Sequence, residues 1–132
     1  MDLEILKIAS SVENHKIIKN HTHYSKNKNS ICGDEMQISL IVRNDKIVDF
    51  GYQCKSCVYC QASVSLLSRK IIKLEIHQIR DLLSSSEFFF EKNEKNNINK
   101  WNDFKKIMNV KNISRKECLL LPFKTLSNAL NL

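Results

Sequence analysis

The chain alternates apolar and polar residues in two short segments, and both alternations have the period of a β-strand. The segments cover 36–43 and 47–52, with the polar stretch 44–46 between them, so they are predicted to form a hairpin. The apolar face consists of Met36, Ile38, Leu40, Val42, Val48, Phe50 and Tyr52. Because opposite residues of an antiparallel pair share a face, the matching partners have numbers that sum to 90; a two-residue loop would make the sum 89.

The open end of this hairpin gathers residues with reactive side chains. Continuing the sum of 90 sets residue 34 opposite 56 and residue 33 opposite 57, so Cys32, Asp34 and Cys57 meet there. A sum of 89 would set Cys32 directly opposite Cys57. The same three residues are therefore neighbours in both registers.

From residue 58 the apolar period becomes helical and continues to residue 74. Ser56 suits the N-cap of this helix, which places Cys57 at its N-terminus. A last helix is predicted from Pro122, since proline is favoured in a first helical turn, and Cys118 lies just before it.

Weaker patterns predict three shorter helices at 3–13, 75–83 and 101–108. Residues 14–31 are polar and predict a connector with a short strand near 15–20, and 84–100 predict a surface loop around three phenylalanines. His21 and His23 would share a face of an extended segment, a pattern that fits a metal pair or a plain surface strand.

Taken together, the elements predict one domain over 1–132 with an α+β fold. Its small antiparallel sheet, the hairpin at about 36–53 with or without a third strand, packs against helices.

Charge and hydropathy narrow the possible functions. The 132 residues include 21 Lys and Arg against 14 Asp and Glu, a net charge of +7 with a pI near 9.2. A basic chain can bind nucleic acid, but here acidic residues are interspersed with the lysines and no aromatic platform accompanies them, so we do not expect a nucleic-acid partner. The apolar runs are too short to cross a membrane, and the acidic start argues against a secretory signal. We expect a reducing, cytoplasmic setting.

Cysteine is the informative residue type, with five copies at positions 32, 54, 57, 60 and 118. In a reducing compartment such clustering indicates metal or thiol chemistry, and an odd number cannot pair completely in disulfides. No histidine adjoins the cysteines, and no second Cys-x-x-Cys follows at the spacing of a zinc ribbon.

The order of these motifs resembles one known family. Cys32-Gly-Asp34-Glu-Met, then a hairpin, then Cys57 followed by Gln61-Ala-Ser-Val-Ser65, then a distant Cys118 entering a C-terminal helix, is similar to the IscU/SufU (NifU N-terminal-like) iron–sulfur cluster assembly scaffolds. The likeness covers about residues 30–130 and implies a SufE/NifU-like fold. It also implies that Cys32, Asp34, Cys57 and Cys118 are the ligands of a cluster or metal.

Details near the last cysteine are closer to the SufU branch of that family. The stretch 111–117 lacks the Leu-Pro-Pro-Val-Lys segment of IscU-type scaffolds, and Glu117 stands where that branch has histidine. Arg115 and the long separation of Cys57 from Cys118 also favour SufU.

Two cysteines depart from the usual SufU pattern. Cys54 occupies a position where SufU proteins usually carry glycine, and Cys60 one where they usually carry serine. Cys60 lies one helical turn after Cys57, so it could be an auxiliary metal ligand or a small buried side chain. The same two interpretations apply to Cys54.

The resemblance implies a scaffold that receives sulfur from a cysteine desulfurase, holds Zn²⁺, Fe²⁺ or a transient iron–sulfur cluster, and passes the cluster to acceptor apo-proteins. Cys118 is the first candidate for the persulfide acceptor and Cys57 the second. Asp34 supplies a harder donor than sulfur and so a weaker corner from which a cluster can leave. We do not expect turnover of a small substrate.

Three other functions stay open on the sequence. One is a zinc-dependent sulfurtransferase that relays persulfide from the desulfurase without building a cluster. Another is a structural zinc module that binds nucleic acid through its lysines. The third is a Cys-His hydrolase, which would need His23 or His77 to approach Cys57 in the fold.

Overall fold

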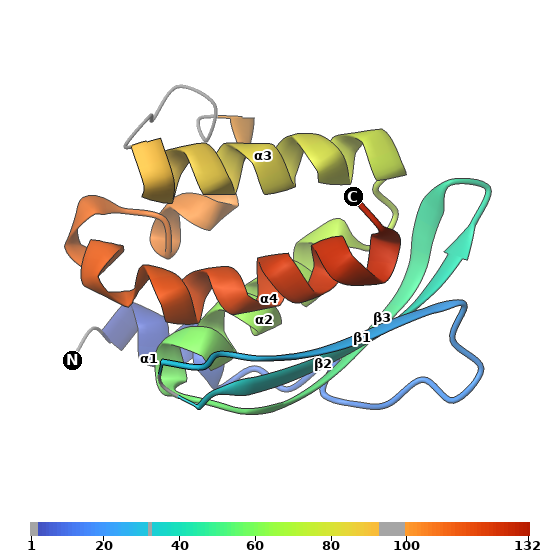
Figure 1. Ribbon diagram of the computed structural model, residues 1–132, viewed down its shortest axis with the longest axis horizontal. Coiled ribbons are helices and arrows are strands. Elements are labelled where there is room, and N and C mark those ends of the chain that lie inside the picture. The colour runs from blue at the N-terminus through green and yellow to red at the C-terminus, as the bar shows by residue number, and fades with distance from the viewer. Residues whose placement is uncertain (1–2, 32, 93–99) are drawn as a thin grey trace.

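The computed structural model describes residues 3–31, 33–92 and 100–132 (Figure 1). In chain order its elements are α1 (Leu3–Ala9), β1 (His23–Lys28), β2 (Glu35–Arg43), β3 (Lys46–Lys55), α2 (Val58–Ile71), α3 (Ile76–Lys92), the 3-10 helices η2 (Asn102–Lys106) and η3 (Val110–Arg115), and α4 (Lys116–Leu130). Cys32 and the stretch 93–99, part of the predicted loop 84–100, lie outside the described residues.

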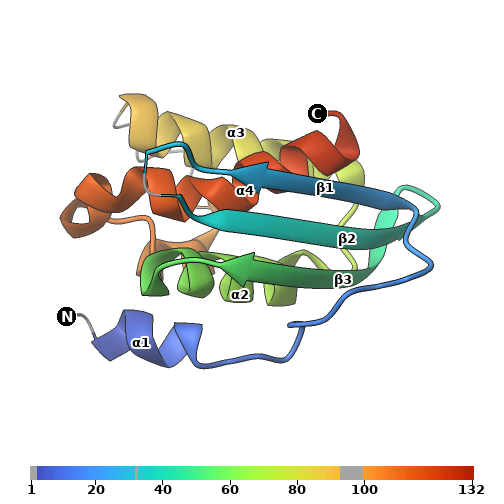
Figure 2. The same ribbon diagram turned by 60° about the horizontal axis from the view of Figure 1, so that its bottom comes forward.

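The strands form one antiparallel sheet in the order β1-β2-β3. Helices α2 and α4 cover one face of this sheet, and α3 lies on the far side of them (Figure 1). The opposite face carries no helix of the described residues and is turned toward the viewer in Figure 2. The predicted α+β fold is confirmed, and the sheet has the third strand that the sequence left open.

The hairpin uses both of the registers considered from the sequence. Partners sum to 90 from the open end as far as Ile41 and Asp49, and to 89 beyond a bulge between Ile41 and Val42. Asn44 and Asp45 form the two-residue turn with φ of 51° and 60°, the left-handed pair of a type I′ turn. The bulge changes which residue faces the core: Val48, predicted to be buried, is 45% exposed, and Ile47 is buried instead.

The core lies between the sheet and the helices. Its largest fully buried side chains include Phe50, Leu40 and Ile38 of the hairpin and Leu67 of α2. Burial of this apolar face is what fixes the register, because a slip by one residue would turn the whole face to solvent.

Helix α3 is longer than predicted. It extends through residues 84–92, which the polar composition assigned to a surface loop, and buries Phe89 and Phe90. The short strand expected near 15–20 is also wrong, since this segment makes a single bridge, from His15 to Tyr52, and the third strand is β1. Strand β1 has no apolar stripe and forms through its pairing with β2.

Helix α4 starts earlier than predicted. It begins at Lys116, so Pro122 lies inside the helix rather than in its first turn, and Cys118 belongs to that first turn. Proline has no N–H, so residue 122 cannot make the helical hydrogen bond to the carbonyl of Cys118, four residues earlier. A helix built on tertiary packing tolerates this loss, and here residues 118–123 are buried.

Candidate metal centre

A tight turn places Asp34 at the start of β2. The Asn29 side chain accepts a hydrogen bond from the backbone N–H of Ile31 at 2.9 Å, and the Asn29 N–H donates to the carbonyl of Asp34 at 2.7 Å. Gly33 has φ of +78°, a left-handed conformation that glycine adopts without a steric penalty. The turn fixes Asp34 in a position where the residue is only 8% exposed.

Cys57 marks the change from strand to helix. Strand β3 ends at Lys55 and α2 begins at Val58, so Cys57 is the N-cap residue, one position later than the predicted Ser56. Its backbone N–H points at Asp34 Oδ2, at 3.4 Å, and the carboxylate is thus next to the positive end of the helix.

Cys118 reaches the same place from the far end of the chain. The Ser63 hydroxyl of α2 donates a hydrogen bond of 2.6 Å to the carbonyl of Leu119, which holds the first turn of α4 against α2. Cys118 is 9% exposed. Ser63 belongs to the Ala-Ser-x-Ser motif, so one role of that motif is to position the last cysteine.

The three side chains converge. The ligand atoms of Asp34, Cys57 and Cys118 all lie within 4.8 Å of one another, the spacing of groups that share one metal ion. Among the described residues, Asp34, Cys57 and Cys118 are the one group of three or more His, Cys, Asp or Glu side chains whose ligand atoms lie this close together. Cys32, the fourth predicted ligand, is two residues before Asp34 and outside the described residues.

Two further cysteines adjoin this group without belonging to it. Cys60 is buried in the first turn of α2, and burial raises the pKa of its thiol, as does the repulsion of Cys54, Asp34 and Cys57. Burial also raises the pKa of Cys54. The Ser56 hydroxyl is buried and has no hydrogen-bond partner within the usual distance and angle limits. It lies beside the sulfurs of Cys54 and Cys60 and lowers the pKa of each thiol, which offsets part of the increase.

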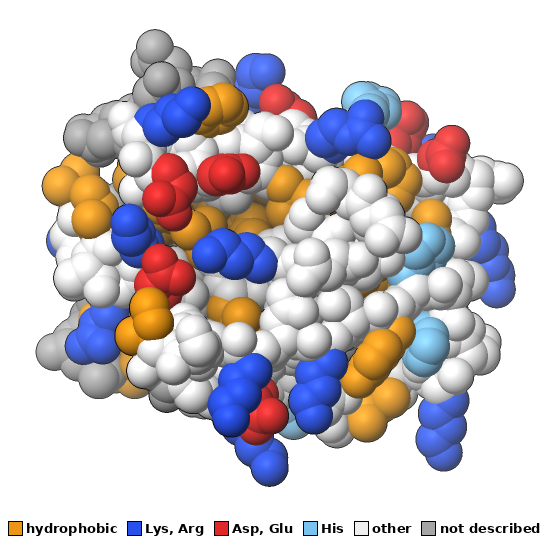
Figure 3. All heavy atoms as spheres, in the orientation of Figure 1, with side chains coloured by type: hydrophobic (Ala, Val, Ile, Leu, Met, Phe, Trp, Pro, Cys, Tyr) orange, Lys and Arg blue, Asp and Glu red, His pale blue; other side chains and the backbone are white. Residues whose placement is uncertain are grey.

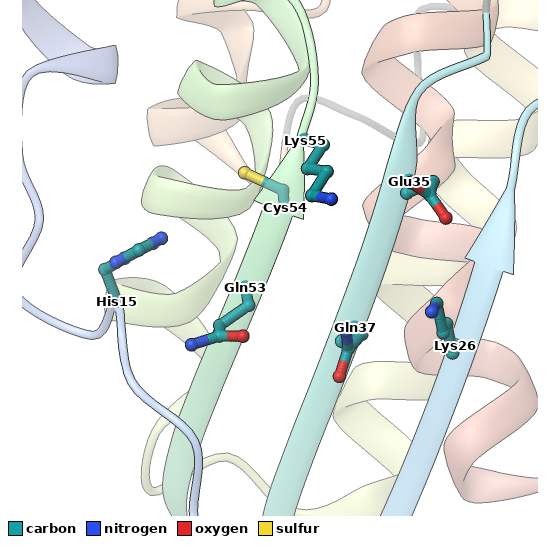
Figure 4. Close-up of a pocket in the computed structure, with 7 residues that line it drawn as sticks. All are labelled: His15, Lys26, Glu35, Gln37, Gln53, Cys54 and Lys55. Carbon is teal, nitrogen blue, oxygen red and sulfur yellow. The ribbon is translucent and has the colours of Figure 1, made fainter.

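Cys54 also lines a separate pocket of about 300 Å³ on the helix-free side of the sheet. The other lining residues are His15, Lys26, Glu35, Gln37, Gln53 and Lys55, and in Figure 4 the side chain of Cys54 points away from that of Lys55. The side chains that converge near Cys57 are not part of this lining.

An aromatic contact beside the site escaped the sequence interpretation. The Arg115 guanidinium lies over the ring of Tyr59, 5.0 Å from its centroid. Tyr59 follows Cys57 by two residues and Arg115 precedes Cys118 by three, so this cation–π pair joins the segments that carry these two cysteines. The sequence drew attention to Arg115, but its aromatic partner depends on the tertiary packing.

The histidines lie elsewhere. His77 is exposed and pairs with Glu75 at 3.2 Å, and His21 stacks on the ring of Tyr24. His23 pairs with Leu40 across the sheet. None of the three belongs to the group around Cys57, so a Cys-His hydrolase gains no partner from them.

Charges of both signs are mixed on the surface. Figure 3 shows Lys and Arg side chains interspersed with Asp and Glu on one face of the molecule. Ion pairs of the described residues, such as Lys16–Asp49 at 3.0 Å and Lys70–Asp103 at 3.2 Å, join opposite charges. This face offers no uniform basic stripe for a nucleic-acid backbone.

Fold and site define a class of protein: a small α+β domain in which two cysteine thiols and a carboxylate converge at one end of its sheet. The comparisons with known proteins give the family. The model of the NifU-like N terminal domain matches residues 5–92. The iron–sulfur cluster assembly scaffold protein IscU of Thermotoga maritima is 30% identical over 131 residues, which cover 96% of this chain and 89% of that protein.

Two solved structures have the same fold as this chain. A protein of Fervidobacterium islandicum, described as an iron–sulfur cluster assembly scaffold for the SUF system, superposes with a TM-score of 0.90 at 28% identity, over 98% of this chain and 96% of that one. A NifU-like N-terminal protein of Brucella abortus shares the fold, with a TM-score of 0.86 at 20% identity, over 98% of this chain and 91% of that one. This chain therefore belongs to the NifU-like N-terminal domain family, and the resemblance to IscU and SufU is confirmed.

One further finding concerns membranes. Among the helices of the described residues, none combines the length and the apolar character needed to cross a bilayer.

Proposed function

We propose that this protein is an iron–sulfur cluster assembly scaffold, in which Cys32, Asp34, Cys57 and Cys118 hold iron or a nascent cluster as cargo. The observation that carries the proposal is the convergence of two thiols and a carboxylate, from three distant parts of the chain, within 4.8 Å. The family membership and the scaffold relatives support the same function.

The donor set fits a cargo that must be released. Thiolates are the preferred ligands of iron in clusters, and a carboxylate oxygen is a harder and weaker ligand for such iron. Zn²⁺ also fits, but structural zinc sites are closed by cysteine and histidine, so a carboxylate in the fourth position is unusual for a purely structural ion. The Asp34 corner is therefore the one through which we expect a cluster to be transferred to an acceptor apo-protein.

Sulfur would arrive as a persulfide from a cysteine desulfurase. The sequence favours Cys118 as the acceptor of the persulfide sulfur, with Cys57 second. The burial of the two side chains favours the opposite order. Cys118 is 9% exposed, whereas Cys57 is only partly buried at the N-terminus of α2. We therefore assign Cys57 as the first acceptor, since a donor persulfide can approach it without a change in the fold.

Anaerobic reconstitution with Fe²⁺ and sulfide tests the scaffold. We expect a visible cluster absorption that is retained after gel filtration and lost in Cys57→Ala and Cys118→Ala. Cys54→Ser is the matched control, because Cys54 lies outside the converging group, and it should keep the absorption. If the protein bound only zinc and stimulated a desulfurase, the persulfide relay would replace the scaffold.

A further inference from the structure

Strand β3 ends at Lys55 and helix α2 begins at Val58. The sequence Cys57-Val-Tyr-Cys60 is therefore a Cys-x-x-Cys motif that opens a helix shortly after a strand. Neither cysteine is in a disulfide. A Cys-x-x-Cys motif at a helix N-terminus is the setting in which proteins carry out thiol–disulfide exchange.

The geometry allows a bond between these two residues. The N–H of Gln61 donates to the carbonyl of Cys57 at 3.0 Å, which closes the first helical turn around the motif. A rise of roughly 1.5 Å per residue and a radius of roughly 2.3 Å then put the Cα atoms of Cys57 and Cys60 about 5 Å apart. Disulfides span Cα distances of about 4.4–6.8 Å, so this separation is compatible with the bond.

The two thiols differ in access. Cys57 is partly exposed at the N-terminus of α2, whereas Cys60, in the first turn of the same helix, is 0% exposed. A sulfur donor from solution therefore meets Cys57 first, while Cys60 is shielded from external reagents. The proposed metal site does not explain Cys60, whose sulfur is not in the converging group.

We propose that Cys57 and Cys60 are a redox dithiol that reduces sulfane sulfur, delivered to Cys57 as a persulfide, to the sulfide that a cluster requires. This inference rests on the proposed function, because it assumes that sulfur arrives on Cys57.

The reaction balances with the groups named. The Cys60 sulfur attacks Cys57 Sγ of the persulfide, forming the Cys57–Cys60 bond and breaking the bond to the terminal sulfur. That sulfur leaves with the electron pair and takes up the Cys60 proton, as hydrogen sulfide. The two thiol sulfurs are oxidised by one electron each, the sulfane sulfur is reduced by two, and an external dithiol reductant restores the pair.

Glutathione persulfide is a suitable probe with the metal-free protein under anaerobic conditions. For the wild type we expect one sulfide released per chain, a mass lowered by two hydrogen atoms, and a Cys57–Cys60 disulfide in peptide mapping. Cys60→Ser should instead retain one extra sulfur atom on Cys57 and release at least about tenfold less sulfide in the same time. Cys60→Ala provides a second variant of small volume, should serine disturb the buried position.

Cys54→Ser is the matched control, because Cys54 stands three residues before Cys57 as Cys60 stands three after it, but lies in a strand. It should release sulfide like the wild type. Equal release by wild type and both Cys60 variants, or a disulfide that joins another pair, would overturn the proposal.

A second assay separates this inference from the scaffold function. With Fe²⁺ and inorganic sulfide, Cys60→Ser should assemble as much cluster as the wild type, whereas with Fe²⁺ and the persulfide as sole sulfur source it should assemble far less. If the wild type formed no cluster from inorganic sulfide, the scaffold function would fail, yet sulfide release and disulfide mapping would still decide the fate of the dithiol.

Discussion

The two ends of the β2–β3 hairpin are built from different interactions. The turn end is held by backbone hydrogen bonds: Ile47 donates to Leu74 at 3.0 Å and accepts from Lys73 at 2.8 Å, and Ile76 donates to Asp45 at 2.8 Å. At the open end, Asp34 and Cys57 meet through a contact of 3.4 Å between a carboxylate and a backbone N–H.

The comparison shows that the turn end of the hairpin stabilises the fold, whereas the open end contributes little to stability. Paired backbone groups and buried aliphatic side chains at the turn end lower the free energy of the fold. Partly buried thiols and a carboxylate at the open end contribute little to folding, and desolvation makes a charged group there costly unless a cation neutralises it.

The largest effect is expected midway along β3, where Phe50 points into the core. Phe50→Ala removes a fully buried ring and should lower the free energy of unfolding by about 3–5 kcal/mol, measured by denaturant titration. Val48→Ala, at the exposed bulge position, is the control and should change it by less than about 0.5 kcal/mol. A similar cost for both would mean that the bulge does not place Val48 outside the core.

The second largest effect is expected for the loss of a proposed metal ligand at the open end. Cys118→Ala should weaken Zn²⁺ or Fe²⁺ binding by at least about 100-fold, since even outer-shell substitutions cost about 10–100-fold. Competition with a chelator measures this affinity. Cys54→Ala should bind the metal like the wild type, and a comparable loss in that variant would bring Cys54 into the site.

Gly51 lies where the N-terminal segment crosses β3. A Cβ at this position would meet the Lys16 carbonyl oxygen at 2.7 Å and Ser39 Oγ at 3.0 Å. Gly51→Ala should therefore lower the free energy of unfolding by about 2 kcal/mol, because backbone must move to make room. Thermal denaturation measures the loss, and an unchanged melting temperature would show that residues 14–18 are not packed on the strand.

Asp34→Ala probes the weak corner of the site. With the carboxylate removed, we expect a reconstituted cluster to stay on the protein longer and to pass to an apo-ferredoxin about tenfold more slowly. This decrease in the transfer rate corresponds to an increase of roughly 1.4 kcal/mol in the activation free energy of transfer. Stopped-flow or circular dichroism kinetics follow the transfer. Equal transfer rates would contradict the role given to Asp34.

The smallest effect belongs to the turn. Asp45 has φ of 60°, a conformation that glycine adopts more easily than aspartate. Asp45→Gly should raise the free energy of unfolding by about 0.5 kcal/mol, without any change in metal affinity. Destabilisation by this variant would show that the Asp45 side chain holds the turn.

Much of this architecture could be predicted from residue spacing. Alternation fixed the partners of Leu40 and Phe50, and from them the meeting of Asp34 with Cys57, because registers propagate along a hairpin. The approach of Cys118 needed the family resemblance, since no local pattern reports how α4 packs on α2.

The errors have a common physical cause. Strand β1, the extension of α3 over Phe89 and Phe90, and the early start of α4 before Pro122 all depend on tertiary partners. Local propensity is weak against such packing. The bulge beside Val42 was not predicted for the same reason. Ile47, which faces the core because of the bulge, makes backbone hydrogen bonds to residues 73 and 74, and these are tertiary contacts.

X-ray absorption at the zinc edge of the zinc-loaded protein tests the central claim most directly, because it counts sulfur and oxygen neighbours. Ligation by three cysteines and Asp34 predicts three sulfurs at about 2.3 Å and one oxygen at about 2.0–2.2 Å, with the oxygen replaced or lost in Asp34→Ala. A shell of four sulfurs that is unchanged in Asp34→Ala would contradict it and would place Cys54 or Cys60 on the metal instead.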